Sequence, residues 1–156
     1  MSYDSSEDTM KHKRNVMWVF MELHDMMFSR MIEHDRSKLH EPEKSGYDEL
    51  VPKLRATKFG TPEYYGARDA MAEVTSHHYK ENRHHPEHFE NGYHDMNLLD
   101  FMEHIIDCYA ASLCSDTPFP DGIKTVLERN GAPDVLIDMV LNTYEDVLKD
   151  IKAKEE

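Results

Sequence analysis

The sequence predicts an all-α protein, folded as a single-domain helical bundle of about six to seven helices. Three observations support this fold class. Apolar residues recur every three or four positions in several long segments, which is the spacing of amphipathic helices. Proline and glycine separate these segments, and no segment alternates polar and apolar residues as a strand would. The length of 156 residues fits one domain.

The predicted elements begin after a polar, acidic segment. Residues 1–9 contain no apolar cluster and are expected to form a flexible tail. Apolar side chains at helical spacing predict a helix over 10–31, and a second helix is expected over 32–39, before the breaker Pro42. Residues 47–59 are predicted to form a third helix, with their apolar side chains facing inward.

The remaining predicted helices have clear start or stop signals. Thr61 is expected to cap a helix that has proline at its first position, and Asp95 is expected to cap a second long helix. A polar loop over 84–93 separates these two helices. The four helices expected in this half of the chain are 62–82, 96–114, 123–130 and 133–152.

The acidic composition of the chain excludes some partners. A formal net charge of −13 repels polyanions, so binding of duplex nucleic acid is not expected. No segment approaches the roughly 20 apolar residues of a membrane span, and the first residues lack the apolar segment of a secretory signal. We therefore expect a cytoplasmic protein, in which Cys108 and Cys114 are buried, reduced thiols.

Histidine is the compositional outlier, with eleven residues in the chain, and it is the commonest metal ligand in proteins. His34 and Asp35 are adjacent, and two neighbours on a helix point about 100° apart. Both side chains therefore reach one ion only at a helix end, which the charged segment after the apolar run predicts here. Lys38 follows one turn later.

A further metal ligand is expected from the preceding helix. His12 lies one turn before Val16, on the apolar stripe of that helix, so its side chain is predicted to face inward. His24 is the competing candidate, because it lies closer to His34 in the chain. The sequence leaves the choice between His12 and His24 open.

A group of histidines lies downstream. Five of them fall within twelve residues: His77, His78, His84, His85 and His88. Clustered imidazolium charges would repel one another, whereas a metal ion binds neutral imidazoles. We expect His78, near the end of one helix, and His84 and His85 just beyond it to be ligands. Which two or three of the five bind metal stays open.

The predicted helix over 96–114 carries polar side chains on one face. Four residues share that face: Asp100, Glu103, His104 and Asp107. Asp107 lies between apolar neighbours, and a buried carboxylate requires a partner. We expect Asp107 to be a metal ligand, and Asp100 or Glu103 to orient a ligand histidine from behind.

The order of these residues resembles the HD-domain superfamily, whose members bind metal through a helix-one histidine, a histidine–aspartate pair and a late helical aspartate. The strings HKRNV, HDRSK, NRHH and DFMEHIIDC are more closely similar to an uncharacterised HD-like family common in phage and bacterial genomes. The resemblance covers roughly residues 10–115 and implies a metal-binding core there, with the helices of 116–156 packed on the same domain. It also implies a bacterial or phage-infected host cell.

The resemblance implies a metal-dependent hydrolase of the phosphohydrolase or phosphodiesterase class, acting on a nucleotide or nucleotide-like phosphoester. It implies one or two divalent transition metals (Mn, Fe, Co, Ni or Zn) and a metal-activated hydroxide as nucleophile. Asp35 would bridge two ions, and Lys38, or Arg83 as a second candidate, would neutralise a phosphate oxygen. Ser37 departs from the commonest HD pattern, in which glycine is frequent at this position.

Three other functions stay open from the sequence. HD-type proteins with similar ligands include mixed-valence di-iron oxygenases. The string HHPEHF resembles pterin carbinolamine dehydratases, but those proteins are α+β and this chain shows no strand pattern. A non-enzymatic, metal-stabilised binding module is the third alternative. The expected partner is a small phosphate compound, with no duplex nucleic acid and no membrane, and homo-oligomerisation is left open.

Overall fold

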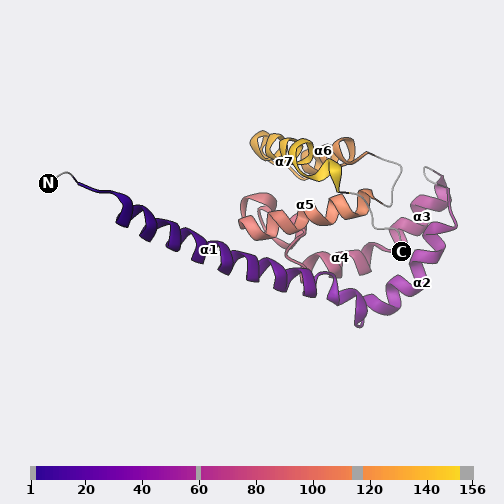
Figure 1. Cartoon of the computed structure of the whole chain (residues 1–156). Helices are drawn as coiled ribbons and strands as arrows, with labels where there is room; N and C mark the ends of the chain where they lie inside the picture. The colour runs from indigo at the N-terminus through magenta and orange to yellow at the C-terminus, as the bar shows by residue number, and fades with distance from the viewer. Residues whose placement is uncertain (1–2, 59–60, 114–117, 152–156) are drawn as a thin grey trace. The chain divides into compact units, whose positions relative to one another are not determined.

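The computed structural model describes residues 3–58, 61–113 and 118–151. Within these ranges it contains seven α-helices, four short 3₁₀ helices and no strand, so the predicted all-α class is confirmed (Figure 1). The chain divides into two compact units, residues 1–34 and residues 35–156. Each unit is described by itself below.

The first unit is a single helix, α1 (Ser6–Glu33) (Figure 1). It begins four residues before the predicted start at Met10, so residues 6–9 are helical and the predicted tail is shorter. Glu7 and Asp8 lie in its first turn, where negative charge is favourable beside the exposed N–H groups of a helix start. Among the described residues, no helix is long and apolar enough to cross a membrane.

The second unit starts with a turn rather than with the helix predicted over 32–39. Asp35 has a left-handed backbone conformation, with φ of 56°, and the 3₁₀ helix η1 (Arg36–Leu39) follows it. Aspartate is one of the few side chains that tolerates this conformation, because its short polar group bonds locally. The prediction of a regular helix here was wrong, since apolar spacing alone does not reveal a left-handed residue.

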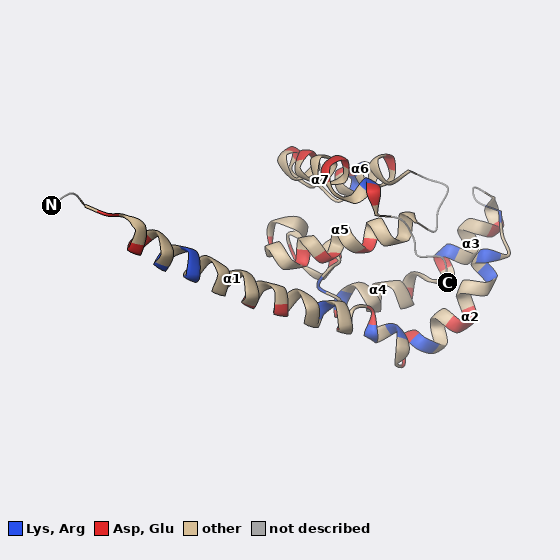
Figure 2. Ribbon diagram, viewed as in Figure 1, with Lys and Arg blue, Asp and Glu red and all other residues tan. Residues whose placement is uncertain are grey.

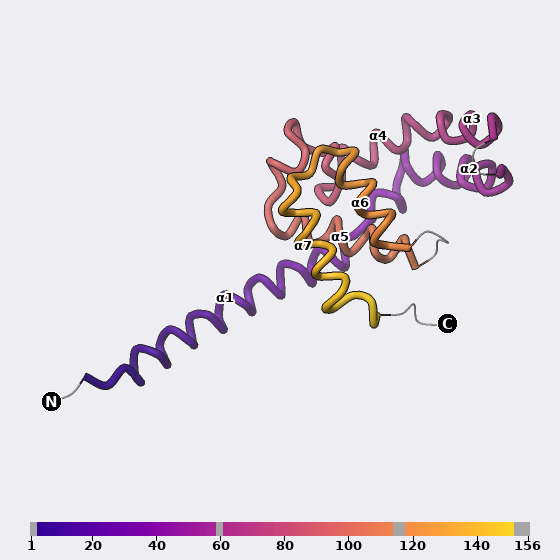
Figure 3. The backbone as a smooth tube through the Cα atoms, turned by 90° about the horizontal axis from the view of Figure 1, so that it is seen from above, coloured from indigo at the N-terminus to yellow at the C-terminus, as the bar shows by residue number. Residues whose placement is uncertain are grey.

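Helices α2 (Glu43–Arg55), α3 (Pro62–Ala70) and α4 (Ala72–Glu81) pack together, and Figure 3 shows α2 and α3 side by side. Thr61 caps α3 by accepting a hydrogen bond from the Tyr64 backbone, as predicted. The single helix predicted over 62–82 is two helices, because the Met71 N–H bonds the Arg68 carbonyl at 3.0 Å and tightens the last turn of α3. Neither proline nor glycine marks that break in the sequence.

Glycine allows close contact between α2 and α4. A Cβ atom at Gly46 would lie 2.3 Å from Val74 Cγ2, so any larger residue there would force the two helices apart. The contact joins the first turns of α2 and α4, and Glu43, three residues before Gly46, reaches His77 and His78 farther along α4. Along α2, basic residues alternate with acidic ones (Figure 2), and Lys53 Nζ lies 2.7 Å from Glu49 Oε1 one turn away.

Two 3₁₀ helices, η2 (Pro86–His88) and η3 (Gly92–His94), lead into α5 (Leu98–Ser112). Asn97, not the predicted Asp95, caps α5: its Oδ1 accepts from the Leu99 and Asp100 backbones, both at 2.9 Å. The Asp100 carboxylate accepts in return from the Asn97 N–H at 3.1 Å. Asp95 instead accepts a hydrogen bond from the Asn91 N–H within the loop. Asparagine and aspartate are both good N-cap residues, so the sequence alone does not show which of the two precedes the first residue of α5.

Helices α6 (Phe119–Arg129) and α7 (Asp134–Asp146) lie side by side (Figure 3), and α6 packs on α5. The 3₁₀ helix η4 (Leu148–Asp150) follows, and its Leu148 carbonyl accepts from the Tyr109 hydroxyl at 2.6 Å. The buried apolar core comprises Tyr93, Ile105, Tyr109, Phe119, Ile123, Leu127, Ala132, Ile137 and Val140. This core anchors α5, which carries the polar face predicted from the sequence.

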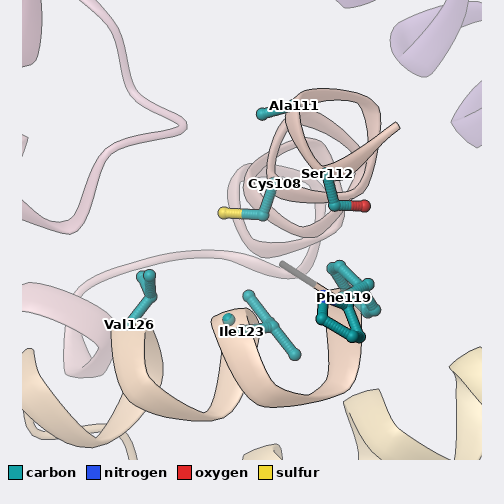
Figure 4. A pocket seen from close by; sticks show the side chains of 8 residues that line it. Cys108, Ala111, Ser112, Phe119, Ile123 and Val126 are labelled. Atoms are coloured by element: carbon teal, nitrogen blue, oxygen red, sulfur yellow. The ribbon is translucent and has the colours of Figure 1, made fainter. Parts of the chain in front are cut away.

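A small apolar hollow of about 230 Å³ lies between α5 and α6 (Figure 4). Cys108 is the one metal-ligating residue type among the described residues that line it, and burial raises the pKa of this thiol to about 12. The thiol is therefore protonated at neutral pH and is a poor metal ligand. Cys108 is partly buried and free, in keeping with the predicted reduced thiol, and Cys114 lies outside the described residues.

Candidate metal centre

Three of the five clustered histidines converge in the second unit. One ring nitrogen each from His78, His84 and His85 lies within 4.8 Å of the other two. The Nε2 atoms of His78 and His85 are 3.0 Å apart, and the ring centroids of His84 and His85 are 4.2 Å apart. His78 and His84 are each only 2% exposed.

The end of α4 explains this convergence. Helix α4 stops at Glu81, and the Asn82 side chain donates to the His78 carbonyl at 2.8 Å. A turn follows, closed by the bond from the His85 N–H to the Asn82 carbonyl at 3.2 Å. This turn folds the chain back, so that residues six and seven positions after His78 face its ring. Pro86 then opens η2 and prevents α4 from continuing.

Asp35 supplies an oxygen to the same point. Its Oδ1 lies 3.2 Å from His78 Nε2 and 3.6 Å from His84 Nε2. Ligand atoms bound about 2.1 Å from a transition metal lie roughly 3 Å from their neighbours, and the observed separations are close to that value. Three imidazoles and one carboxylate are a donor set that suits first-row divalent metals. The residues present therefore fit a metal ion.

His85 is held in the form that binds metal. Burial, together with the neighbouring His84 and His78 rings, lowers the pKa of His85 to about 3. The ring is therefore neutral at physiological pH, and its lone pair is available to a cation.

Two carboxylates lie behind the histidines. Glu103, from α5, places its Oε1 3.3 Å from His84 Nδ1. Glu43, from α2, places its Oε2 2.9 Å from His78 Nδ1. Sequence reasoning missed Glu43, because it stands in the polar HEPEK segment that resembles a solvated loop. Nothing local distinguishes it from its acidic neighbours.

Asp100 and Arg83 form a structural link instead of facing the histidines. The Asp100 carboxylate is fully buried and accepts from Arg83 Nε at 3.1 Å and Nη2 at 2.8 Å. The same carboxylate completes the cap of α5. The bidentate pair ties the loop that carries His84 to the start of α5. Arg83 also stacks its guanidinium over Phe89, 4.9 Å from the ring centroid.

A comparison with known families places the chain in one group. Residues 1–136 match the model of a family of unknown function, DUF5662. The chain belongs to this family. The match extends on both sides of the predicted 10–115 core, into α7, and carries no activity with it. No curated protein and no solved structure matches the chain.

Several predicted metal ligands of this DUF5662 member remain predictions. His12 and His34 belong to the first unit, as does the alternative His24, which contacts the neighbouring Asp25 at 3.1 Å. Asp107 is half-buried on α5, and its charge raises the pKa of His85 against the effect of burial. Its carboxylate is not part of the cluster that His78, His84 and His85 form.

Three further histidines of the second unit have contacts of their own. His77 Nδ1 lies 2.9 Å from Glu43 Oε1, on the side of that carboxylate away from His78. His88 packs against the Phe89 ring at 4.8 Å between centroids. His104 is buried, and its Nε2 lies 3.0 Å from the Tyr93 hydroxyl. The structure thus separates three converging histidines from three that pack elsewhere.

Lys38 stands beside the candidate centre, as predicted from the HDRSK string. Its Nζ lies 2.5 Å from Asp35 Oδ2, the carboxylate oxygen opposite the one that faces the histidines. The ammonium also lies over the Tyr47 ring, 5.6 Å from its centroid. The side chain is 38% exposed, so a solvent-borne anion can reach it.

Proposed function

We propose that this chain is a metal-dependent phosphohydrolase acting on a nucleotide or nucleotide-like phosphoester. The convergence of His78, His84, His85 and Asp35, with spacings of 3.0–3.6 Å between paired donor atoms, carries the proposal. The HD-like order of residues in the sequence supports it. One or two divalent transition metals at this site would supply Lewis acidity and would lower the pKa of a water molecule toward neutrality.

The residues around the site have different roles in this proposal. The three imidazoles and Asp35 Oδ1 would hold the cation in a partly buried site, where electrostatic interactions are stronger than in water. Lys38 holds Asp35 Oδ2 and thereby orients the carboxylate toward the histidines. Because it is partly exposed, its ammonium also reaches a phosphate oxygen at the mouth of the site.

Electrostatics favours a small phosphate substrate over a polymer. The net charge of −13 repels an extended polyanion over the whole surface. A divalent cation and Lys38 reverse that potential locally, which is sufficient for one or a few phosphate groups. A nucleotide fits this requirement, whereas duplex nucleic acid would have to approach the acidic residues along α5, α6 and α7 (Figure 2).

The test is turnover of a nucleotide panel by metal-loaded protein, with and without a chelator. The panel covers mono-, di- and triphosphates, deoxy forms and cyclic nucleotides, separated by chromatography. We expect chelator-sensitive conversion of at least one member. Asp35→Asn and His78→Gln should each lower that rate at least about 100-fold. His94→Gln, which removes an exposed histidine of η3, should leave the rate unchanged.

A second candidate follows from the same donor set. Imidazole and carboxylate ligands also suit iron, so an HD-type di-iron oxygenase is chemically compatible with the site. Iron-loaded protein that consumes oxygen, and that leaves every phosphoester of the panel intact, would replace the hydrolase proposal with this one. Metal binding without either reaction would favour a metal-stabilised binding module.

A further inference from the structure

Glu43 is the most enclosed charged group beside the candidate centre. Its side chain is 0% exposed, and it lies in the first turn of α2. The carboxylate accepts a hydrogen bond from Ser37 Oγ at 2.9 Å, and the Nδ1 atoms of His77 and His78 each lie 2.9 Å from one of its oxygens. A carboxylate has only acceptor atoms, which suits a position that three polar hydrogen-bearing groups approach.

Counting protons around His78 identifies its tautomer. Ser37 has one hydroxyl hydrogen, and it points to Glu43 Oε2. Asn82 Nδ2 has two hydrogens, and these are directed to Ser37 Oγ and to the His78 carbonyl, both at 2.8 Å. Asn82 Nδ2 and Ser37 Oγ also lie 2.9 Å and 3.2 Å from His78 Nδ1, but their hydrogens are directed to the acceptors just named. A carboxylate oxygen has no hydrogen to donate, so we assign the hydrogen between His78 Nδ1 and Glu43 Oε2 to the imidazole.

We propose that Glu43 is a positioning residue that holds His78 as the Nδ1–H tautomer and so directs its Nε2 lone pair toward the metal. This inference rests on the metal site of the proposed function. A neutral imidazole carries one hydrogen, so a proton on Nδ1 leaves Nε2 as the acceptor. His78 Nε2 is the atom that faces Asp35 Oδ1 and His85 Nε2.

The surroundings of Glu43 prevent it from turning away. Its two oxygens are engaged from different sides, Oε1 by His77 and Oε2 by His78 and Ser37. The close contact between Gly46 and Val74 presses α2 onto α4, which keeps the carboxylate at this distance. A buried carboxylate is costly unless it is bonded in this way. The three contacts to the Glu43 carboxylate offset that cost and hold the side chain in one orientation.

The first measurement reads the tautomer directly, in the metal-free protein. Nitrogen-15 NMR of the imidazole rings distinguishes protonated from unprotonated nitrogens at each histidine. We expect His78 of the wild-type chain to carry its hydrogen on Nδ1. In Glu43→Gln the amide offers a single acceptor oxygen, and we expect the Nε2–H form of His78 to appear beside the Nδ1–H form. Wild-type protein with His78 protonated on Nε2 would overturn the inference without requiring any variant.

The second measurement is metal affinity, from competition of Zn²⁺ and Co²⁺ between the protein and a chelating dye. Glu43→Gln should bind about 10–100-fold more weakly, the usual effect of removing a carboxylate behind a ligand histidine. The absorption spectrum of bound Co²⁺ should shift as well, because the His78 ligand is reoriented. Glu49→Gln is the matched control: it alters an exposed acid of the same helix that pairs with Lys53, and its affinity should stay within about twofold.

The two proposals fail separately in these experiments. Wild-type protein that binds metal tightly but hydrolyses no phosphoester would refute the proposed function and leave the role of Glu43 standing. Equal metal affinity in Glu43→Gln and in wild type would refute the role of Glu43, whatever the turnover. Metal affinity that falls equally in Glu49→Gln and Glu43→Gln would also refute it.

Discussion

The buried histidine His104 makes the stability of the metal-free protein depend on pH in a defined window. It is 3% exposed, and burial lowers its pKa to about 4, against smaller raising effects of the His84 backbone and the Asp107 charge. In the unfolded chain its pKa is about 6.5. Between these two values the unfolded chain binds more protons than the fold, so stability is full above about pH 6.5 and falls as the pH decreases toward 4.

The expected loss follows from the size of the shift. Each pH unit below 6.5 costs about 1.4 kcal/mol for one group that stays neutral in the fold, which gives about 2 kcal/mol at pH 5 for His104. His85, with its pKa lowered to about 3, adds a smaller loss because its ring is only partly buried. Glu43 contributes at lower pH, since its pKa is below the ordinary value.

Urea unfolding in the presence of a chelator measures this loss at pH 7.5, 6.5, 5.5 and 5.0. The comparison is with His104→Gln, whose amide keeps a polar group near the Tyr93 hydroxyl but does not titrate. Both proteins share every other titrating group, so their difference isolates His104. We expect wild type to lose about 2 kcal/mol more than the variant between pH 7.5 and 5.0. Equal losses would show that His104 is protonated in the fold, and the reasoning would be wrong.

Three further predictions concern the framework around the site. Leu127→Ala leaves a cavity in the fully buried core and should cost about 2–5 kcal/mol in urea unfolding; a loss below about 1 kcal/mol would contradict the core assignment. Gly46→Ala drives a methyl group into Val74, so it should weaken Zn²⁺ binding and lower the melting temperature together, and unchanged values of both would refute the close helix contact. Asn97→Ala should cost about 1 kcal/mol and Asp95→Ala clearly less, an order that reverses if Asp95 is the true cap.

Local sequence signals predicted several parts of this structure. Thr61 and Pro62 marked the start of α3, because capping depends on residues within one turn. The grouping of His78 with His84 and His85 was also predictable, since a helix end brings residues six or seven positions apart together. Helical spacing placed Glu103 on the polar face of α5 that also carries Asp107, and in the structure its carboxylate lies 3.3 Å from His84 Nδ1.

Other features left no readable trace in the sequence. The left-handed turn at Asp35 and the break at Met71 depend on single backbone torsions, and neither position carries glycine or proline. Asp100 was expected to support the metal and instead bonds Arg83 and caps α5. An acid on the polar face of a helix has several equivalent uses, and only its neighbours in space select one.

The sequence by itself determined that the chain is helical and that His78, His84 and His85 fall close together near the end of a helix. Both are short-range properties, because periodicity, capping and cluster spacing act over a few residues. The tertiary structure decided which acid stands behind His78. Glu43 lies 35 residues earlier, and packing of α2 on α4 places its carboxylate 2.9 Å from the ring. Glu43 resembles the many surface acids in sequence, but burial makes it a fixed hydrogen-bond acceptor, because a buried carboxylate is costly unless it is hydrogen-bonded.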